Sequence, residues 1–257
     1  MEHLGIDTIG AVQVLTLNRP ESLNAFSPEM ILGLTNALKE ADTNPDIKVI
    51  VLRGAGRAFS AGGDVKTMGT ASTSEVYDHI GVLNDCILTI KGIGLPIVAA
   101  VHGFAAGAGF NLALACDLII ASDDSKFALS FSQVGLISDG GGSYFLPKLI
   151  GPHLSKEFFF TAEPIPAERL YQLGVINKLV SPENLQDEVM KMANRLSSGP
   201  TKAYGQMKRI IDYSLTTTLS DTLERERITQ TMMISTQDHR EGVAAFTEKR
   251  KPRFIGE

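Results

Sequence analysis

The sequence predicts an α/β core followed by a helical C-terminal region, and three observations support this fold class. The order strand, glycine-rich loop, helix occurs twice, over residues 48–64 and 96–116. Both of its strands are apolar runs of the kind that is buried on both faces of a parallel sheet. Strand signals then nearly vanish after residue 152, where helical spacing of apolar residues takes over. A chain of 257 residues is long enough to bury a substantial core without disulfides or metals.

The elements of the N-terminal part follow from local patterns. Apolar and polar residues alternate over residues 12–18, which predicts half-buried strands in a hairpin. Ser27 then predicts a helix N-cap with Pro28 at the first helical position, and the helix runs to about residue 41. Residues 48–52 predict a buried strand, and Asp64 follows a loop of glycines as a possible cap of another short helix.

The middle of the chain contains an uncharged run, residues 92–116, long enough to cross a bilayer. Pro96, His102 and Asn111 interrupt it, together with several glycines. It therefore predicts a strand, a glycine-rich turn and a helix of small residues rather than a membrane span. Further signals predict strands at 118–121, 126–130 and 175–180, and a turn at 138–142 that precedes a helix.

Composition excludes several functional classes. The 24 basic and 29 acidic side chains give a net charge of −5, whereas nucleic-acid binding proteins usually carry a basic excess. Cys86 and Cys116 are the only cysteines, and no two histidines have metal-ligand spacing, so neither a disulfide scaffold nor a metal site is expected. The N-terminus lacks the pattern of a secretory signal. We expect a soluble, cytoplasmic protein without nucleic-acid or membrane partners.

The two glycine-rich loops are the first candidates for chemistry. Gly54-Ala55-Gly56 suggests a dinucleotide fingerprint, but its sixth position is Phe59, and no loop carries the lysine of a P-loop. The chain also has no Gly-x-Ser-x-Gly nucleophile elbow. One interpretation is that the N–H groups of Gly63 and Ala108 converge as an oxyanion hole. The other is that the glycines only permit tight turns, and spacing does not separate the two.

Asp139 is the second candidate, and it also has two interpretations. A carboxylate before three glycines and a helix can act simply as an N-cap. Its neighbours are apolar, however, and an apolar pocket disfavours the charged form of a carboxyl group and raises its pKa. A carboxylate with such a pKa suits a general base near neutral pH.

Five segments, taken together, identify a family. They are Asn18-Arg19-Pro20 with Leu23-Asn24-Ala25, then residues 58–66 (AFSAGGDVK), 102–109 (HGFAAGAG), 173–177 (LGVIN) and 246–251 (FTEKRK). In this order they resemble the crotonase superfamily of enoyl-CoA hydratases and isomerases over nearly the whole chain. The resemblance implies a crotonase-like spiral of ββα units over residues 1–195 and a helical oligomerisation region over residues 196–257. It also implies a homotrimer or homohexamer.

The resemblance also implies the substrate and the roles of individual residues. The substrate is an acyl-CoA thioester, and no separate cofactor is needed because coenzyme A is part of that substrate. The N–H groups of Gly63 and Ala108 would bind the thioester oxygen. Coenzyme A would contact Ser22, Leu23, Ala25 and Ala61 in one subunit and Phe246 and Lys249 in the tail of its neighbour. Without the resemblance, Lys249 and the basic residues after it would be read as a solvated end of the chain.

The departures from the family pattern bear on the reaction. Hydratases of the superfamily use two glutamates, whose positions are Asn111 and Phe131 here. Isomerases keep one acid where Asp139 stands, so we expect a 3-enoyl-CoA to 2-enoyl-CoA isomerase of lipid metabolism with Asp139 as its catalytic residue. An aryl epoxide isomerase, an enoyl-CoA hydratase and a non-catalytic acyl-CoA-binding relative are the alternatives. A dehalogenase is disfavoured, because the chain has no tryptophan. The expected acyl-pocket residues are Met68, Asn111, Phe131 and Ile137.

Overall fold

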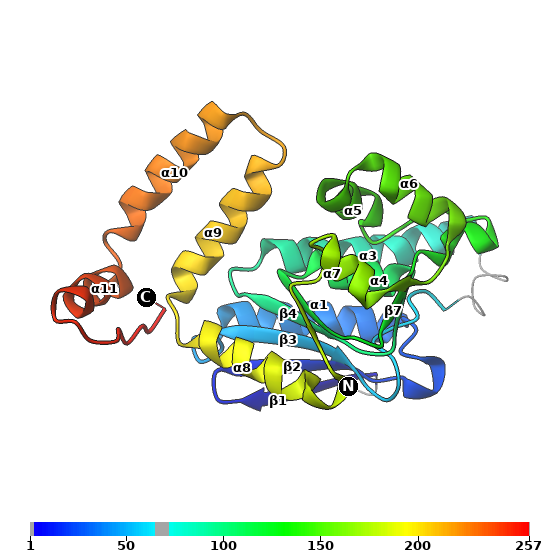
Figure 1. The fold of residues 1–257 in the computed structure, drawn as a ribbon, viewed down its shortest axis with the longest axis horizontal. Helices are drawn as coiled ribbons and strands as arrows, with labels where there is room; N and C mark the ends of the chain where they lie inside the picture. Colours follow the sequence, from blue (N-terminus) through cyan, green and yellow to red (C-terminus); the bar gives the residue numbers. More distant parts are fainter. Residues whose placement is uncertain (1–2, 65–71, 257) are drawn as a thin grey trace.

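A computed structural model describes residues 3–64 and 72–256 (Figure 1). Its larger sheet has six strands in the order β1-β2-β3-β4-β6-β9, and a smaller sheet has three in the order β5-β7-β8. β1 and β2 form an antiparallel hairpin, and β2, β3, β4, β6 and β9 are successively parallel. The strands are β1 (Leu4–Ile9), β2 (Val12–Leu17), β3 (Val49–Gly54), β4 (Ile97–Val101), β5 (Phe104–Ala106), β6 (Leu118–Ser122), β7 (Lys126–Ala128), β8 (Ile165–Pro166) and β9 (Lys178–Val180).

Helices connect and cover these strands. They are α1 (Pro28–Thr43), α3 (Thr73–Gly92), α4 (Ala108–Ala115), α5 (Gly142–Ile150), α6 (Pro152–Thr161), α7 (Ala167–Gln172), α8 (Leu185–Ser197), α9 (Thr201–Ser214), α10 (Leu219–Met233) and α11 (Gln237–Thr247). Short 3₁₀ turns lie at η1 (Pro20–Ser22), η2 (Ser130–Val134) and η3 (Pro182–Asn184). The hairpin and the helix start predicted at Ser27 are confirmed, since the Ser27 hydroxyl accepts a hydrogen bond from the N–H of Met30 at 3.1 Å.

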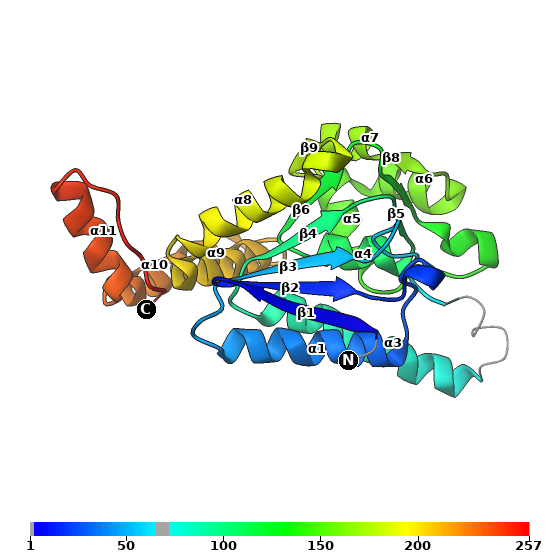
Figure 2. The same ribbon diagram turned by 90° about the horizontal axis from the view of Figure 1, so that it is seen from below.

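The two faces of the larger sheet bury separate hydrophobic clusters. On β3, Ile50 and Leu52 pack with α1, α3 and α4, whereas Val49 and Val51 pack with α8 on the opposite face. This alternation follows from the two-residue period of a strand. Figure 2 shows α1 and α3 below the sheet and α8 above it.

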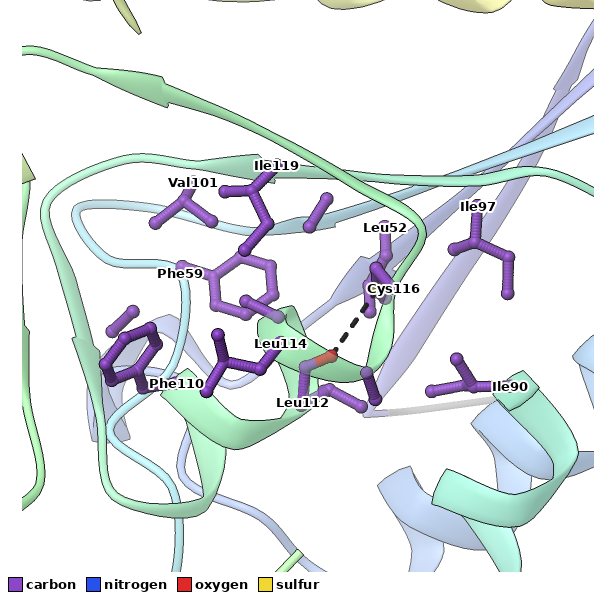
Figure 3. Packing of buried hydrophobic residues seen from close by; sticks show 14 of the residues in the cluster. Leu52, Phe59, Ile90, Ile97, Val101, Phe110, Leu112, Leu114, Cys116 and Ile119 are labelled. Carbon is purple, nitrogen blue, oxygen red and sulfur yellow. Dashed lines mark hydrogen bonds between the residues drawn. The ribbon is translucent and has the colours of Figure 1, made fainter. Parts of the chain in front are cut away.

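The helix α4 is wholly buried, and its side chains form the centre of the larger cluster. In Figure 3, Phe110, Leu112 and Leu114 lie beside Phe59 from the loop after β3 and Val101 from β4. The Cys116 thiol donates to the carbonyl oxygen of Leu112 at 3.4 Å. The uncharged run thus contains the predicted strand and helix, β4 and α4, and the short strand β5 lies where only a turn was expected. No helix among the described residues is both long and apolar enough to span a bilayer.

The C-terminal helices α9, α10 and α11 project from the core (Figure 1). Lys208 on α9 ties them to it, because its ammonium group donates to the carboxylate of Asp117 at 2.8 Å and to the carbonyl oxygen of Leu95 at 3.2 Å. The same oxygen of Asp117 accepts the N–H of Ile97 at the start of β4. The ion pair between Lys91 and Asp212, at 2.9 Å, adds a second link between the core and α9.

The sequence predicted most elements but not all of them. The strand expected at 175–180 is shorter, Lys178–Val180, and the smaller sheet was not predicted as a separate unit because β5, β7 and β8 have only two or three residues each. The boundary between core and tail at residue 195 falls within α8, which packs on the sheet. The division into these two functional regions stays a prediction.

Candidate active site

The two glycine-rich loops meet at Gly62. This residue has a φ of +82°, and a β-carbon built on it would lie 2.5 Å from the carbonyl oxygen of Ala106 and 2.8 Å from the nitrogen of Ala108. Only glycine permits so close an approach of two backbones together with a left-handed φ. The N–H of Gly63, the next residue, is therefore brought close to the N–H of Ala108.

The amides of Gly63 and Ala108 have no hydrogen-bond acceptor within the described part of the chain. No hydrogen bond between described residues uses either N–H as its donor. Ala108 is the first residue of α4, where N–H groups have no partner within the helix and the helix dipole is positive. Two such donors suit an oxygen atom that becomes negative during a reaction.

Leu23 and Ala61 are also neighbours, because the N–H of Ala61 donates to the carbonyl oxygen of Leu23 at 2.8 Å. Asn24 holds the first loop in place. Its buried side chain donates to the carbonyl oxygens of Ala55 and Ala58, both at 2.8 Å. Leu23 and Asn24 both have positive φ, at 52° and 55°. The segment from Ser22 to Ala25 thus lies beside the loop of Gly63, although sequence reasoning assigned no role to Asn24.

Arg19 links the segment from Ser22 to Ala25 to the loop of Gly63 through a hydrogen bond and an ion pair. Its guanidinium group donates to the carbonyl oxygen of Ala25 at 2.8 Å and forms an ion pair with Asp64 at 3.3 Å. Asp64 directly follows Gly63, so this pair supports the backbone that carries one of the two donors. The side chains of Arg19 and Asp64 are only 17% and 19% exposed, so water screens the pair less than it would at the surface.

Asn111 connects α4 to the turn that contains Asp139. Its amide Nδ2 donates to the carbonyl oxygen of Asp139 at 2.7 Å and to the hydroxyl of Ser138 at 3.0 Å. Asn111 lies three residues after Ala108, which is about 5 Å along the helix. The backbone of Asp139 is thereby bonded to α4, the helix that begins at Ala108.

The carboxyl group of Asp139 is partly withdrawn from water. Burial raises its pKa above the ordinary value, while its own backbone N–H and the charge of His79 on α3 partly oppose this shift. Its Oδ1 is buried and, among the described residues, has no hydrogen-bond partner. A desolvated carboxylate with an unused lone pair is well suited to take up a proton.

Phe131 lies at the N-terminal end of α4. A β-carbon built on Gly107 would be 3.6 Å from the tip of the Phe131 ring and 4.0 Å from the carbonyl oxygen of Ala61. Phe131 is partly buried against the main cluster. Its ring therefore places an apolar surface beside the two amides.

The structure does not bring every expected residue to this place. Ile137 is 89% exposed, and Phe246 is 88% exposed at the end of α11. Lys249 follows α11 in the projecting tail, where it has a φ of +55°. Within one chain Phe246 and Lys249 lie in the projecting tail. Their contact with coenzyme A was expected in the site of a neighbouring subunit and stays a prediction. Met68 lies outside the described residues.

Other reactive groups lie apart from these loops. Burial raises the pKa of the Cys86 thiol to about 11 and also raises the pKa of Cys116. Across residues 3–64 and 72–256, no group of three histidine, cysteine, aspartate or glutamate side chains is arranged to hold a metal ion. The site that the described residues form consists of backbone amides, one carboxylate and an aromatic ring.

Comparison with known proteins relates this arrangement to a family. The family model described as enoyl-CoA hydratase/isomerase matches residues 7–257. The 1,2-epoxyphenylacetyl-CoA isomerase of Escherichia coli K12 is 37% identical over 250 residues, which are 95% of each chain. The crotonyl-CoA hydratase of Syntrophomonas wolfei is 32% identical over 99% of this chain and 98% of its own. The crystal structure of an enoyl-CoA hydratase from Polaromonas sp. JS666 superposes with a TM-score of 0.95 at 35% identity, covering 98% of this chain and 99% of that one.

Proposed function

Because the chain belongs to the enoyl-CoA hydratase/isomerase family, we propose that it is an acyl-CoA isomerase with Asp139 as its only acid–base group. The proposed reaction converts a 3-enoyl-CoA into the conjugated 2-enoyl-CoA. The observation that carries the proposal is the Oδ1 of Asp139, buried and without a hydrogen-bond partner among the described residues, in a turn whose backbone is bonded to α4, the helix that begins at Ala108.

In the proposed mechanism, the carboxylate of Asp139 removes a proton from C2 of the thioester. The electrons move onto the thioester oxygen, and the N–H groups of Gly63 and Ala108 stabilise the resulting dienolate. The protonated Asp139 then returns the proton to C4, while the double bond shifts from C3=C4 to C2=C3. No water is consumed, so one carboxylate is enough. The raised pKa of Asp139 favours both proton uptake and its temporary storage.

The residues at two other positions argue against hydration as the main activity. Addition of water across a double bond needs one group to activate water and another to deliver a proton. Asn111 and Phe131 stand where the hydratases of the superfamily have glutamates, and neither side chain can exchange a proton in this way. The ring of Phe131 also restricts water beside the two amides.

The test measures conversion of 3-hexenoyl-CoA by the parent protein, Asp139→Asn and Asp124→Asn. Asp124 is an exposed loop residue and serves as the control. We expect Asp139→Asn to lose at least about 10²-fold in kcat with binding of a saturated acyl-CoA unchanged, and Asp124→Asn to match the parent. Parent-like isomerisation by Asp139→Asn would refute the assignment. Binding of acyl-CoA without turnover of any thioester would instead support the non-catalytic alternative.

A second candidate function is isomerisation of an aryl epoxide thioester. It is favoured by the 37% identity to the epoxyphenylacetyl-CoA isomerase of E. coli. Asp139 and the two amides would serve this reaction as well, since it also develops charge beside a thioester. The ratio of kcat/KM for 3-hexenoyl-CoA and for 1,2-epoxyphenylacetyl-CoA distinguishes the two functions, and crotonyl-CoA in the same assay measures hydratase activity.

We further propose that the working form is a homotrimer or a pair of trimers. Large apolar side chains of the tail are exposed within one chain, among them Leu219 at 74% and Phe246 at 88%. A cavity of about 930 Å³ lies between α9, α10 and α11, lined by such side chains. Monomeric proteins rarely leave so much contiguous apolar surface uncovered. Light scattering gives the assembly mass, and a monomer in solution would overturn this proposal.

A further inference from the structure

We infer that Asn111 is a positioning residue that fixes the turn of Asp139, so that the carboxylate stays at the reacting carbons. This inference rests on the function proposed above. Position 111 is one of the two glutamate positions of the superfamily's hydratases. In the proposed role Asn111 takes no part in proton transfer there and instead holds the backbone of Asp139, an arrangement that we call the clamp.

Two hydrogen bonds form the clamp. The amide Nδ2 of Asn111 donates to the main-chain oxygen of Asp139 at 2.7 Å and to the Ser138 hydroxyl at 3.0 Å. The first is directed at the backbone of Asp139 itself, so it restrains the point from which the catalytic side chain extends. Asn111 belongs to the buried helix α4, which also contains the Ala108 donor. The clamp therefore fixes the position of the turn relative to that donor.

The turn has few other restraints of its own. Gly140 and Gly141 follow Asp139, with φ of +57° and +86°, and glycine has more backbone freedom than any other residue. Two other groups among the described residues donate to the carbonyl oxygen of Asp139, the N–H of Gly142 and the hydroxyl of Ser138, and both bonds are long at 3.4 Å. Asn111 therefore provides the short bond that holds this carbonyl group.

The fit around Asn111 is tight enough to make the clamp specific. The side chain is fully buried. A β-carbon built on Gly142 would lie 2.3 Å from its Oδ1 and 2.6 Å from its Nδ2. The backbone of α5 thus presses on the amide, and only glycine at position 142 leaves room for it. Any longer side chain at position 111 would have to displace the turn.

The groups that face Asp139 come from three elements. They are Asn111 on α4, Ser138 in the turn itself, and His79 on α3, whose charge acts on the carboxylate. Leu83, one helical turn after His79, lies 3.5 Å from the position of a β-carbon on Gly140, so this face of α3 adjoins the turn. Removing the Asn111 amide leaves His79 and α3 in place. Any change in the titration of Asp139 then indicates that its carboxylate has moved.

The test compares Asn111→Leu, Ser138→Ala and the control Gly81→Ala in the isomerase assay over a range of pH. Asn111→Leu keeps the branching and the number of side-chain heavy atoms but removes both bonds. We expect its kcat to fall about 10²-fold with little change in KM, because a displacement of about 1 Å at the reacting group has this effect. A released carboxylate reaches water, so the acid limb of the kcat/KM profile should move to lower pH. Ser138→Ala keeps the 2.7 Å bond and should lose less than about tenfold.

The control Gly81→Ala lies on the exposed side of α3, where a β-carbon meets nothing within 4 Å, and should behave as the parent does. If Asn111→Leu does not fold, Gly142→Ala displaces the same amide and should show the same loss of kcat and the same shift of the acid limb. The inference is overturned if both the kcat and the pH profile of the altered protein match those of the parent. Such a result, together with an inactive Asp139→Asn, would leave the proposed function intact, whereas an active Asp139→Asn would refute the function itself.

Discussion

A single methyl group placed at Gly62 should separate the two amide donors. Gly62 has a φ of +82°, which costs an alanine about 1–2 kcal/mol. The added carbon would also meet the oxygen of Ala106 at 2.5 Å and the nitrogen of Ala108 at 2.8 Å. Both contacts are with backbone atoms, which cannot rotate away. Restoring an ordinary contact of about 3.4 Å to the Ala108 nitrogen requires a relative movement of about 0.6 Å between the loops.

That movement shifts one donor away from the developing oxyanion. Loss of one such donor costs about 10²–10³ in kcat, equivalent to about 2.7–4 kcal/mol of transition-state stabilisation. We therefore expect Gly62→Ala to lose at least about 10²-fold in kcat for 3-hexenoyl-CoA. Formation of the conjugated 2-enoyl thioester, followed by its absorbance, measures this rate.

Gly174→Ala is the matched control. Gly174 has a φ of +76°, but a β-carbon on it meets nothing within 4 Å, and it lies in an exposed turn after α7. It should therefore lose only the strain energy, about 1–2 kcal/mol of stability, and keep its kcat. Equal kcat values for folded Gly62→Ala and Gly174→Ala would refute the argument that Gly62 sets the distance between the donors.

Three further predictions concern charge and burial. The folded-state pKa of Asp139 is raised, so ionisation of this carboxyl group destabilises the fold once the pH exceeds the ordinary aspartate pKa. Asp139→Asn should therefore raise the melting temperature at pH 7. This gain should disappear as the pH falls below the ordinary aspartate pKa. Arg19→Met removes the guanidinium group of the half-buried ion pair with Asp64 and should lower the free energy of unfolding in denaturant by about 1–3 kcal/mol. Arg227→Met removes an exposed pair with Glu224 and should change it by less than about 1 kcal/mol. Cys86 should resist a thiol reagent at pH 8 until the chain is unfolded, because burial raises its pKa to about 11.

Each of these has a result that would contradict it. A melting temperature of Asp139→Asn at or below that of the parent at pH 7 would mean that the ionised carboxylate is not a burden on the fold. Equal unfolding free energies for the variants at Arg19 and Arg227 would mean that the ion pair with Asp64 adds nothing to the loops. Rapid labelling of Cys86 in the native protein would show that the helix α3 opens to solvent.

The sequence was sufficient for the elements whose signal is local. The Ser27-Pro28 helix start depends on one hydroxyl and one ring, and the run 48–52 depends on its own apolar side chains, so both could be predicted from neighbouring residues. β5 and β8 could not, because strands of two or three residues show no period and exist only through their partners, whereas β7 lies within the strand predicted at 126–130. The same holds for Asn24, whose importance lies in three carbonyl groups more than 30 residues away.

The residues of the candidate site likewise fall into those marked by local patterns and those that depend on contacts between distant parts of the chain. Glycines and the positions before helices marked Gly63, Ala108 and Asp139 as candidates, and the family resemblance implied their roles. The contact between Asn111 and Asp139 joins residues 28 apart on different elements, and no local pattern indicates it. A glycine at position 142, packed against an asparagine amide, was visible in the sequence only as one more glycine of a turn.

The two donors that we propose for the oxyanion are backbone groups, and this has a consequence for how such proteins change over evolutionary time. No substitution except proline deletes the N–H of Gly63 or of Ala108, so in the proposed mechanism the means of stabilising the thioester anion is inherited with the fold. The groups that would decide the fate of that anion are the side chains at positions 111, 131 and 139, which lie in α4, in η2 and in the turn before α5. New reactions can therefore arise by exchanging a few side chains around an anion site that is never rebuilt.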